Sequence, residues 1–191
     1  MDALVLGGEN RESNQQWIEQ VADVLAPLFN SVTYLTYKHW QGDDIPFDMN
    51  HEQRKLRLMA DTFQIENRAY IIVAKSVGSV LALREMCDQQ IFPFGLVMCG
   101  VPYYSPEDSN DKVAKNTAKE LPALLATNRT LPTYILQNPD EKFILPCNLE
   151  RLLEEQNLTN YTVLQGPGGG HQYDVEFLEQ SVAIFKERYG V

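Results

Sequence analysis

The chain has 191 residues, of which 44% are hydrophobic and 22% charged, and this composition is typical of a globular protein with one domain. Its formal net charge of −10 disfavours binding to nucleic acid and to anionic membrane surfaces, because the phosphate groups of both are repelled. No apolar run is long enough to span a bilayer. We therefore expect neither nucleic acid nor a membrane among the partners, and the sequence leaves the oligomeric state open.

The N-terminus and the cysteines both indicate a cytoplasmic protein. The first residues, MDALVLGGEN, contain a short apolar run and no basic segment, which predicts a strand rather than a signal peptide. Cys87, Cys99 and Cys147 are far apart and form no C-x-x-C pair. They therefore predict neither a zinc site nor a redox pair, and no metal is expected.

Short apolar runs alternate with amphipathic ones along the chain. The apolar runs predict six strands, at residues 3–6, 32–35, 70–74, 94–98, 133–136 and 161–164. Helices are predicted between and after these strands. The first has Ser13 and Gln16 as a capping box, and the second carries Leu56, Met59 and Phe63. The others are predicted at 77–89, in a segment that ends near Pro122, at 148–155 and at 175–189. This alternation predicts an α/β fold, a three-layer sandwich of a mostly parallel six-stranded sheet with helices on both faces.

The domain organisation is predicted to be simple. No linker, repeat or low-complexity tract divides the chain, so residues 1–191 are expected to form a single domain. Residues 101–131 contain several prolines and polar residues between two strands, and we interpret them as a small cap-like insertion rather than a separate domain.

Ser76 lies where a predicted buried strand turns into a helix. The segment Ala74-Lys75-Ser76-Val77-Gly78 has small residues two positions before and two positions after the serine, so that strand and helix can approach closely. Such a turn exposes the hydroxyl at the helix N-terminus, where unpaired amides favour a developing negative charge. A serine that only caps the helix has the same local pattern, so the motif alone leaves both interpretations open.

A nucleophilic serine needs a base and an orienting carboxylate. Among the three histidines, His171 follows a glycine-rich loop after the last strand, on the edge of the sheet where loops gather. Asp140 follows the preceding strand and is the predicted carboxylate. Its neighbour Glu141 could substitute, and Asp108 is a more distant candidate.

Ser76, Asp140 and His171, each after a separate strand, resemble the triad of the α/β-hydrolase superfamily in their chain order. The resemblance extends along essentially the whole chain, in a minimal form that lacks the leading strands of the family. It implies an oxyanion hole from the N–H of Val77 and from that of Gly8 or Glu9, and no cofactor. The chain departs from the family pattern at Ala74, Gly7-Gly8 and Gln137-Asn138.

The resemblance implies a serine hydrolase that cleaves esters or thioesters of small acyl substrates. Five apolar residues in two loops are predicted to line a shallow substrate pocket: Trp40, Phe47, Val101, Tyr103 and Tyr104. Two other classes of function stay open. One is a catalytically silent binding protein of the same fold, and the other is a non-hydrolytic enzyme such as an acyltransferase or a lyase.

Overall fold

The computed structural model describes residues 1–42, 44–103 and 112–191. In this part of the chain, six strands form one sheet in which every neighbouring pair is parallel. The strands are β1 (Asp2–Leu6), β2 (Val32–Leu35), β3 (Tyr70–Lys75), β4 (Gly95–Cys99), β5 (Thr133–Gln137) and β6 (Tyr161–Gln165). The predicted strands and the α/β fold class are confirmed.

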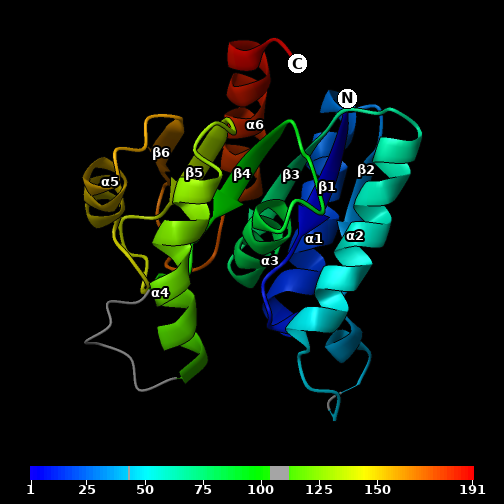
Figure 1. Ribbon diagram of the computed structural model, residues 1–191, viewed down its shortest axis with the longest axis horizontal. Helices are drawn as coiled ribbons and strands as arrows, with labels where there is room; N and C mark the ends of the chain where they lie inside the picture. Colours follow the sequence, from blue (N-terminus) through cyan, green and yellow to red (C-terminus); the bar gives the residue numbers. More distant parts are fainter. Residues whose placement is uncertain (43, 104–111) are drawn as a thin grey trace.

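The helices cover both faces of this sheet (Figure 1). They are α1 (Arg11–Leu25), α2 (Met49–Ile65), α3 (Val77–Cys87), α4 (Lys112–Thr127), α5 (Pro146–Glu155) and α6 (Val175–Tyr189), with two short 3-10 helices at Ala26–Leu28 and Lys38–Gln41. Helices α1 and α6 pack against each other on one face, whereas α3 packs between α2 and α4 on the other. The three-layer sandwich predicted from the sequence is therefore confirmed.

Helix α1 begins earlier than the sequence analysis predicts. The Asn10 side chain accepts a hydrogen bond from the Ser13 backbone N–H at 3.1 Å, so Asn10 is the N-cap residue and Ser13 lies inside the helix. Asn and Ser are about equally good caps, and the capping box pattern at Ser13 was therefore misleading. The earlier start matters for the site, because it places Asn14 next to the loop that follows β1.

Helix α4 continues past Pro122, where the sequence analysis predicts its end. A proline inside a helix removes one backbone hydrogen bond, which favours termination. However, Leu121 and Leu125 on either side of it are fully buried, and Glu120 forms a salt bridge to Arg84 of α3 at 2.5 Å. These tertiary contacts outweigh the lost hydrogen bond.

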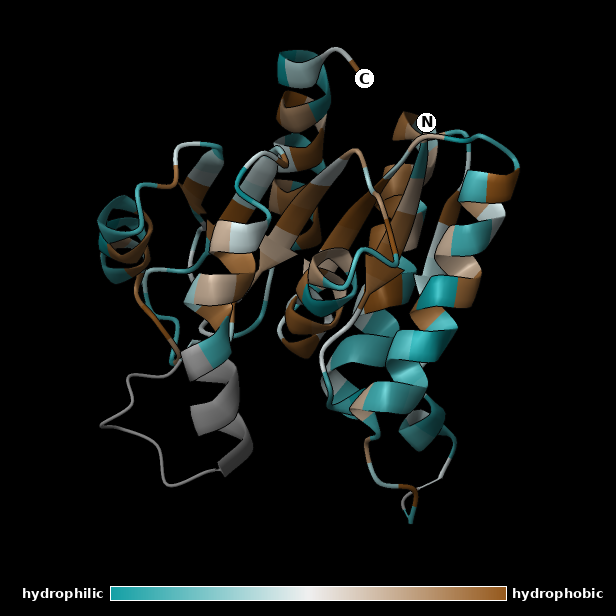
Figure 2. Ribbon diagram, in the orientation of Figure 1, coloured by the Kyte–Doolittle hydropathy of each residue, from teal (hydrophilic) through white to brown (hydrophobic). Residues whose placement is uncertain are grey.

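The core lies on both faces of the central strands. Every residue of β1, β3, β4 and β5 is buried, because helices cover both sides of the sheet. Figure 2 shows β1, β3 and β4 mostly in brown, whereas much of the outward surface of α1 and α2 is hydrophilic. Strand β6 forms one edge of the sheet, and most of its residues are half-buried.

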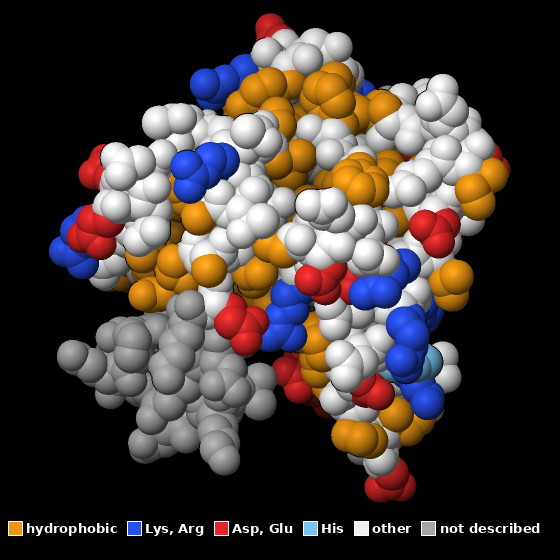
Figure 3. Space-filling view, viewed as in Figure 1, with side chains coloured by type: hydrophobic (Ala, Val, Ile, Leu, Met, Phe, Trp, Pro, Cys, Tyr) orange, Lys and Arg blue, Asp and Glu red, His pale blue; other side chains and the backbone are white. Residues whose placement is uncertain are grey.

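Charged side chains of both signs are present on the surface. On the face shown in Figure 3, Lys and Arg side chains lie among acidic ones. Among the described helices, none has both the length and the apolar character needed to cross a bilayer.

The order of the strands defines where a ligand could bind. The sheet order β2-β1-β3-β4-β5-β6 places β2 and β3 on opposite sides of β1. The connections after β1 and β3 therefore run to opposite faces of the sheet, and open parallel sheets bind ligands in the crevice between two such connections. The loop after β1 contains Gly7, Gly8 and Glu9, and Ser76 directly follows β3.

Candidate active site

Ser76 forms a tight turn between β3 and α3. Its backbone has φ 54° and ψ −122°, a conformation that costs a non-glycine residue about 1–3 kcal/mol. The Ser76 N–H donates to the Cys99 carbonyl at 2.9 Å, which ties the turn to the end of β4. Such strain persists only where surrounding structure imposes it, and it is frequent at functional sites.

Gly78 lets the start of α3 approach the loop after β1. A Cβ atom on Gly78 would lie 2.6 Å from the Gly7 carbonyl oxygen and 2.9 Å from Leu6 Cβ. Both distances are far below van der Waals contact, so a larger residue would push α3 away from β1. The small residue two positions after Ser76 is therefore needed for this contact, which brings the N-terminus of α3 beside the Gly7 to Glu9 loop.

His171 lies in the loop between β6 and α6. The three glycines before it, Gly168, Gly169 and Gly170, have φ values of 110°, 113° and 59°, which glycine adopts without strain. The loop places the imidazole against the end of β4, where a Cβ on Gly100 would lie only 2.7 Å from His171 Cε1. Since Gly100 follows the residue that holds the Ser76 turn, serine and histidine lie at the same edge of the sheet.

The carboxylate beside His171 is Glu141. Glu141 Oε2 lies 2.9 Å from His171 Nδ1 and accepts a hydrogen bond from Tyr173 OH at 2.7 Å. Its other oxygen accepts from the Lys142 backbone N–H at 2.9 Å. Burial raises the pKa of the Glu141 carboxyl, but the hydrogen bonds from His171 and Tyr173 lower it, and the net direction is downward. An ionised Glu141 holds the proton of a neutral imidazole on Nδ1, which leaves Nε2 available as a base.

Asp140, the carboxylate predicted from the sequence, does not occupy this position. Its Oδ2 accepts a hydrogen bond from the Gly169 N–H at 3.2 Å, and bonds from the backbone of Gly170 and Gly169 lower the pKa of Asp140. The reason is the turn after β5, in which the Glu141 N–H donates to the Asn138 carbonyl at 3.2 Å. This turn directs Asp140 to the solvent and Glu141 into the protein. Asp108 lies outside the described residues.

Asn138 holds the loop that carries His171, a role that the sequence analysis did not assign. Its Nδ2 donates to the carbonyls of Gly170 and Gln172, at 2.9 and 2.7 Å. These residues lie immediately before and after His171. Gly166 leaves the space for this side chain, because a Cβ there would lie 2.1 Å from Asn138 Oδ1. The only signal in the sequence is a polar residue directly after a buried strand.

Gly8 is not free to serve as an oxyanion donor. The Gly8 N–H donates to Asn14 Oδ1 at 2.9 Å, and this bond is buried. Asn14 is only 4% exposed and lies on the inner face of α1 with Trp17 and Ile18. A polar residue on the apolar face of a predicted helix is the signal that could have identified it.

The remaining candidates for the oxyanion hole are the N–H groups of Glu9 and Val77. The Glu9 carbonyl accepts from His39 Nε2 at 2.6 Å and from Trp40 Nε1 at 2.8 Å, and the Gly7 carbonyl accepts from Tyr37 OH at 2.8 Å. These bonds fix the loop on both sides of the Glu9 N–H. Within the described residues, neither the Glu9 nor the Val77 N–H has a recorded acceptor. Both N–H groups are thus available to an oxyanion, and the contact of Gly7 with Gly78 brings the loop that carries Glu9 beside the helix end that carries Val77.

The residues predicted to line a substrate pocket are found in different environments. Trp40 is 3% exposed and packs over Gly7, and Val101 is fully buried, so neither lines an open surface. Phe47 is half-buried and packs edge-on against His39. Tyr104 lies outside the described residues.

Tyr103 lines a cavity of about 420 Å³ beside Glu141. The remaining residues around it come from the segment after Glu141 and from α5: Lys142, Phe143, Ile144, Leu145, Asn148, Arg151, Leu152 and Glu155. The ring of Phe143 contacts the His171 imidazole edge-on, with 4.6 Å between the centroids. This cavity therefore adjoins the Glu141–His171 pair.

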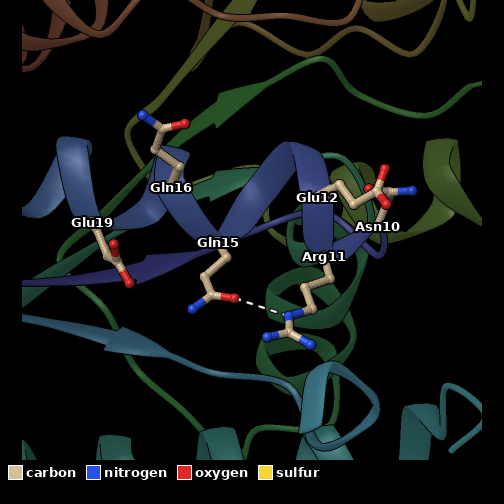
Figure 4. A pocket seen from close by; sticks show the side chains of 6 residues that line it. All are labelled: Asn10, Arg11, Glu12, Gln15, Gln16 and Glu19. Carbon is tan, nitrogen blue, oxygen red and sulfur yellow. Dashed lines mark hydrogen bonds between the residues drawn. The ribbon is translucent and has the colours of Figure 1, made fainter. Parts of the chain in front are cut away.

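A larger hollow of about 660 Å³ lies on the exposed side of α1 and is lined by polar side chains, including Arg11 and Gln15 (Figure 4). Arg11 Nε donates to Gln15 Oε1 at 3.0 Å, and the hollow contains none of the predicted catalytic residues. Over the described ranges, no three His, Cys, Asp or Glu side chains are grouped so as to hold a metal ion.

No protein-family model matches the sequence, and no curated protein is similar to it. Solved structures match the fold. A haloalkane dehalogenase loop variant from Bradyrhizobium elkanii has a TM-score of 0.73 and 12% identity over 99% of this chain and 91% of its own. The esterase domain of a Rhodothermus marinus protein has a TM-score of 0.67 and 12% identity over 98% of this chain and 86% of its own.

A protein described as a hydrolase of the alpha/beta superfamily, from Xanthomonas campestris pv. campestris, matches with a TM-score of 0.64 and 14% identity over 100% of this chain and 99% of its own. The chain spans 60% of the length of another match, an uncharacterized protein from Bacillus cereus ATCC 10987. At such identities the likeness concerns the fold. The parallel sheet, the turn at Ser76 and these structural neighbours together show that the chain has the α/β-hydrolase fold.

Proposed function

We propose that the chain is a serine hydrolase that cleaves carboxylic esters or thioesters of small acyl groups. The observation that carries this proposal is the pairing of buried Glu141 with half-buried His171, with 2.9 Å between Oε2 and Nδ1, at the same edge of the sheet as the strained Ser76 turn. A carboxylate that fixes an imidazole next to a serine is the arrangement needed to activate a hydroxyl.

In the proposed mechanism, His171 Nε2 takes the Ser76 hydroxyl proton while Oγ attacks the acyl carbon. Glu141 stabilises the imidazolium that results, and the N–H groups of Glu9 and Val77 donate to the oxyanion. Each such donor contributes about 3 to 4 kcal/mol at the transition state. His171 then protonates the leaving group, and water hydrolyses the acyl-enzyme by the same steps.

Within the described residues, the His171 imidazole is hydrogen-bonded to Glu141 and not to Ser76. Catalytic hydrogen bonds are often long or poorly aligned before substrate binds, so this geometry is compatible with the mechanism. The proposal therefore requires the Ser76 hydroxyl to reach His171 Nε2 in the substrate complex.

Ser76 should be the residue that a fluorophosphonate probe labels. The probe reacts with serines whose hydroxyl is activated by a base, and the adduct can be mapped by mass spectrometry. We expect one adduct, on Ser76, and its loss in His171→Gln. Ser79 provides an internal control, because it is buried in the same helix and its hydroxyl donates to the Ala74 carbonyl at 3.4 Å.

Absence of labelling in well-folded protein would contradict the proposal and favour a catalytically silent binding protein. If labelling occurs, product analysis with and without an added alcohol distinguishes hydrolysis from acyl transfer.

Short acyl esters should be cleaved best. Several residues around the 420 Å³ cavity beside Glu141 are exposed polar side chains, among them Lys142, Asn148 and Arg151. A methylene group that remains in water gains none of the roughly 0.8 kcal/mol that burial supplies. We expect kcat/KM for p-nitrophenyl esters to rise by about one such increment for each methylene that is buried. The rise should stop before the acyl chain reaches about eight carbons. A steady rise up to palmitate would instead reveal a deep apolar channel.

A further inference from the structure

Gln137, the last residue of β5, is a buried amide that joins two loops near the site. The residue is fully buried. Its Oε1 accepts a hydrogen bond from the Val101 N–H at 3.1 Å, and its Nε2 donates to the Ile144 carbonyl at 2.8 Å. An amide is suited to this position, because one bond needs an acceptor and the other needs a donor. The side chain therefore ties the loops after β4 and after β5 to each other.

The two bonded backbone groups belong to segments that line the cavity of about 420 Å³ next to the proposed base. Ile144 lines this cavity itself, as part of the segment 143–145. Val101 lies two residues before Tyr103, another residue of the lining, and the Tyr103 N–H donates to the Val101 carbonyl at 2.9 Å. The position of Tyr103 therefore follows that of Val101. Gln137 thus holds both parts of the lining in a fixed arrangement.

The cavity adjoins the proposed base and has several apolar residues in its lining. The Phe143 ring lies edge-on against the His171 imidazole, with 4.6 Å between the centroids. Three aliphatic residues also line the cavity: Ile144, Leu145 and Leu152. Aliphatic side chains next to the base are suited to an acyl chain, and each methylene that is buried against them increases kcat/KM by about fourfold.

We propose that Gln137 is a positioning residue that sets the shape of this cavity and thereby the preference for the length of the acyl chain. This role rests on the proposed function. Removal of the amide leaves the buried Val101 N–H and Ile144 carbonyl without this partner, and an unpaired buried polar group is unfavourable. Both segments must then move to reach other partners, and this movement separates the residues of the lining from an acyl chain.

The proposed base and its carboxylate are held by other hydrogen bonds. Glu141 Oε2 lies 2.9 Å from His171 Nδ1 and accepts from Tyr173 OH at 2.7 Å. The loop that carries His171 is held by the side chain of Asn138, the residue after Gln137. Adjacent residues at the end of β5 thus hold different parts of the site. Loss of the Gln137 amide should therefore change the selectivity between esters more than the activity on the shortest one.

The test compares p-nitrophenyl butyrate with p-nitrophenyl acetate in the wild type and in Gln137→Met. Methionine fills a similar volume without the amide. Two buried methylenes should favour butyrate by about fifteenfold in kcat/KM in the wild type, and we expect this ratio to fall by at least about threefold in the variant. A smaller fraction of folded protein would lower kcat/KM for both esters equally and leave the ratio unchanged.

Gln165→Met is the matched control, because Gln165 is the register partner of Gln137 on β6 but is exposed. Its ratio should remain that of the wild type. An unchanged ratio in folded Gln137→Met, or an equal fall in the two variants, would overturn the proposal. If Gln137→Met does not fold, Gln137→Asn replaces it. This variant keeps an amide that is one methylene too short to make both bonds, so its ratio should also fall, and no fall would overturn the proposal.

Binding of butyramide, an analogue without a leaving group, separates this role from the proposed function. An NMR titration followed by the methyl signals of Ile144 needs no catalysis. We expect weaker binding in Gln137→Met than in the wild type, and equal binding, or no binding to the wild type, would overturn the proposal. An absent fluorophosphonate adduct together with weaker butyramide binding refutes the hydrolase but not the role of Gln137. An adduct on Ser76 together with an unchanged ester ratio refutes the role of Gln137 but not the hydrolase.

Discussion

Glu141→Gln should lower kcat for p-nitrophenyl acetate by about ten-thousandfold, the loss seen when the carboxylate of such a triad becomes an amide. An amide can donate a hydrogen bond to His171 Nδ1 and so favours the wrong tautomer. It also cannot stabilise the imidazolium. The measurement is steady-state kinetics, with circular dichroism and a thermal melt to show that the variant is folded.

Asp140→Asn is the matched comparison, because it makes the same chemical change one residue earlier. It alters an exposed hydrogen bond to the Gly169 N–H at 3.2 Å and leaves the Glu141–His171 pair intact. We expect its kcat to stay within about tenfold of the wild type, since the altered bond is solvent-exposed. The reverse order of effects would show that Asp140 is the functional carboxylate and that the pairing with Glu141 is not used in the reaction.

Gly100→Ala should reduce kcat/KM by about a hundredfold, the scale of loss that follows a displacement of about 1 Å at a reacting group. A Cβ on this residue would lie 2.7 Å from both His171 Cε1 and Tyr173 Cε2. The imidazole must therefore move away from the end of β4, and with it Nε2, the nitrogen that takes the Ser76 proton in the proposed mechanism. Kinetics with p-nitrophenyl acetate, together with the His171 NMR signals, would detect this movement.

Gly190→Ala provides the control for backbone strain. Gly100 and Gly190 have similar φ values, 60° and 68°, but a Cβ on Gly190 would have nothing within 4 Å. Both variants should lose stability, by about 1 kcal/mol from the unfavourable φ. Only Gly100→Ala should lose activity as well. Equal activity losses would mean that the contact with His171 has no special importance.

The fold was predictable because each element depends on local patterns. Uninterrupted apolar runs identified all six strands, and their alternation with amphipathic segments determined the parallel sheet. Helix ends were less predictable: Asn10 replaced Ser13 as the cap of α1, and α4 continued through Pro122. Both outcomes depend on competition between similar local signals or on packing from distant parts of the chain.

The candidate site was predictable only in part, for a related reason. Ser76 and His171 could be placed from their positions after strands, because the topology alone brings strand ends to one edge. The choice between Asp140 and Glu141 could not be made in this way, because it depends on which side of a turn each residue faces. The Gly8 N–H could not be excluded either, since its acceptor Asn14 belongs to the next helix.

His171, the proposed base, follows the edge strand β6, but its loop is held by Asn138, which follows the internal strand β5. β6 has a neighbour on one side only, so its residues can separate from the sheet more easily than those of β5. Asn138 follows β5, and its amide holds the two carbonyls that flank His171. Local opening at the end of β6 therefore leaves the imidazole attached to β5.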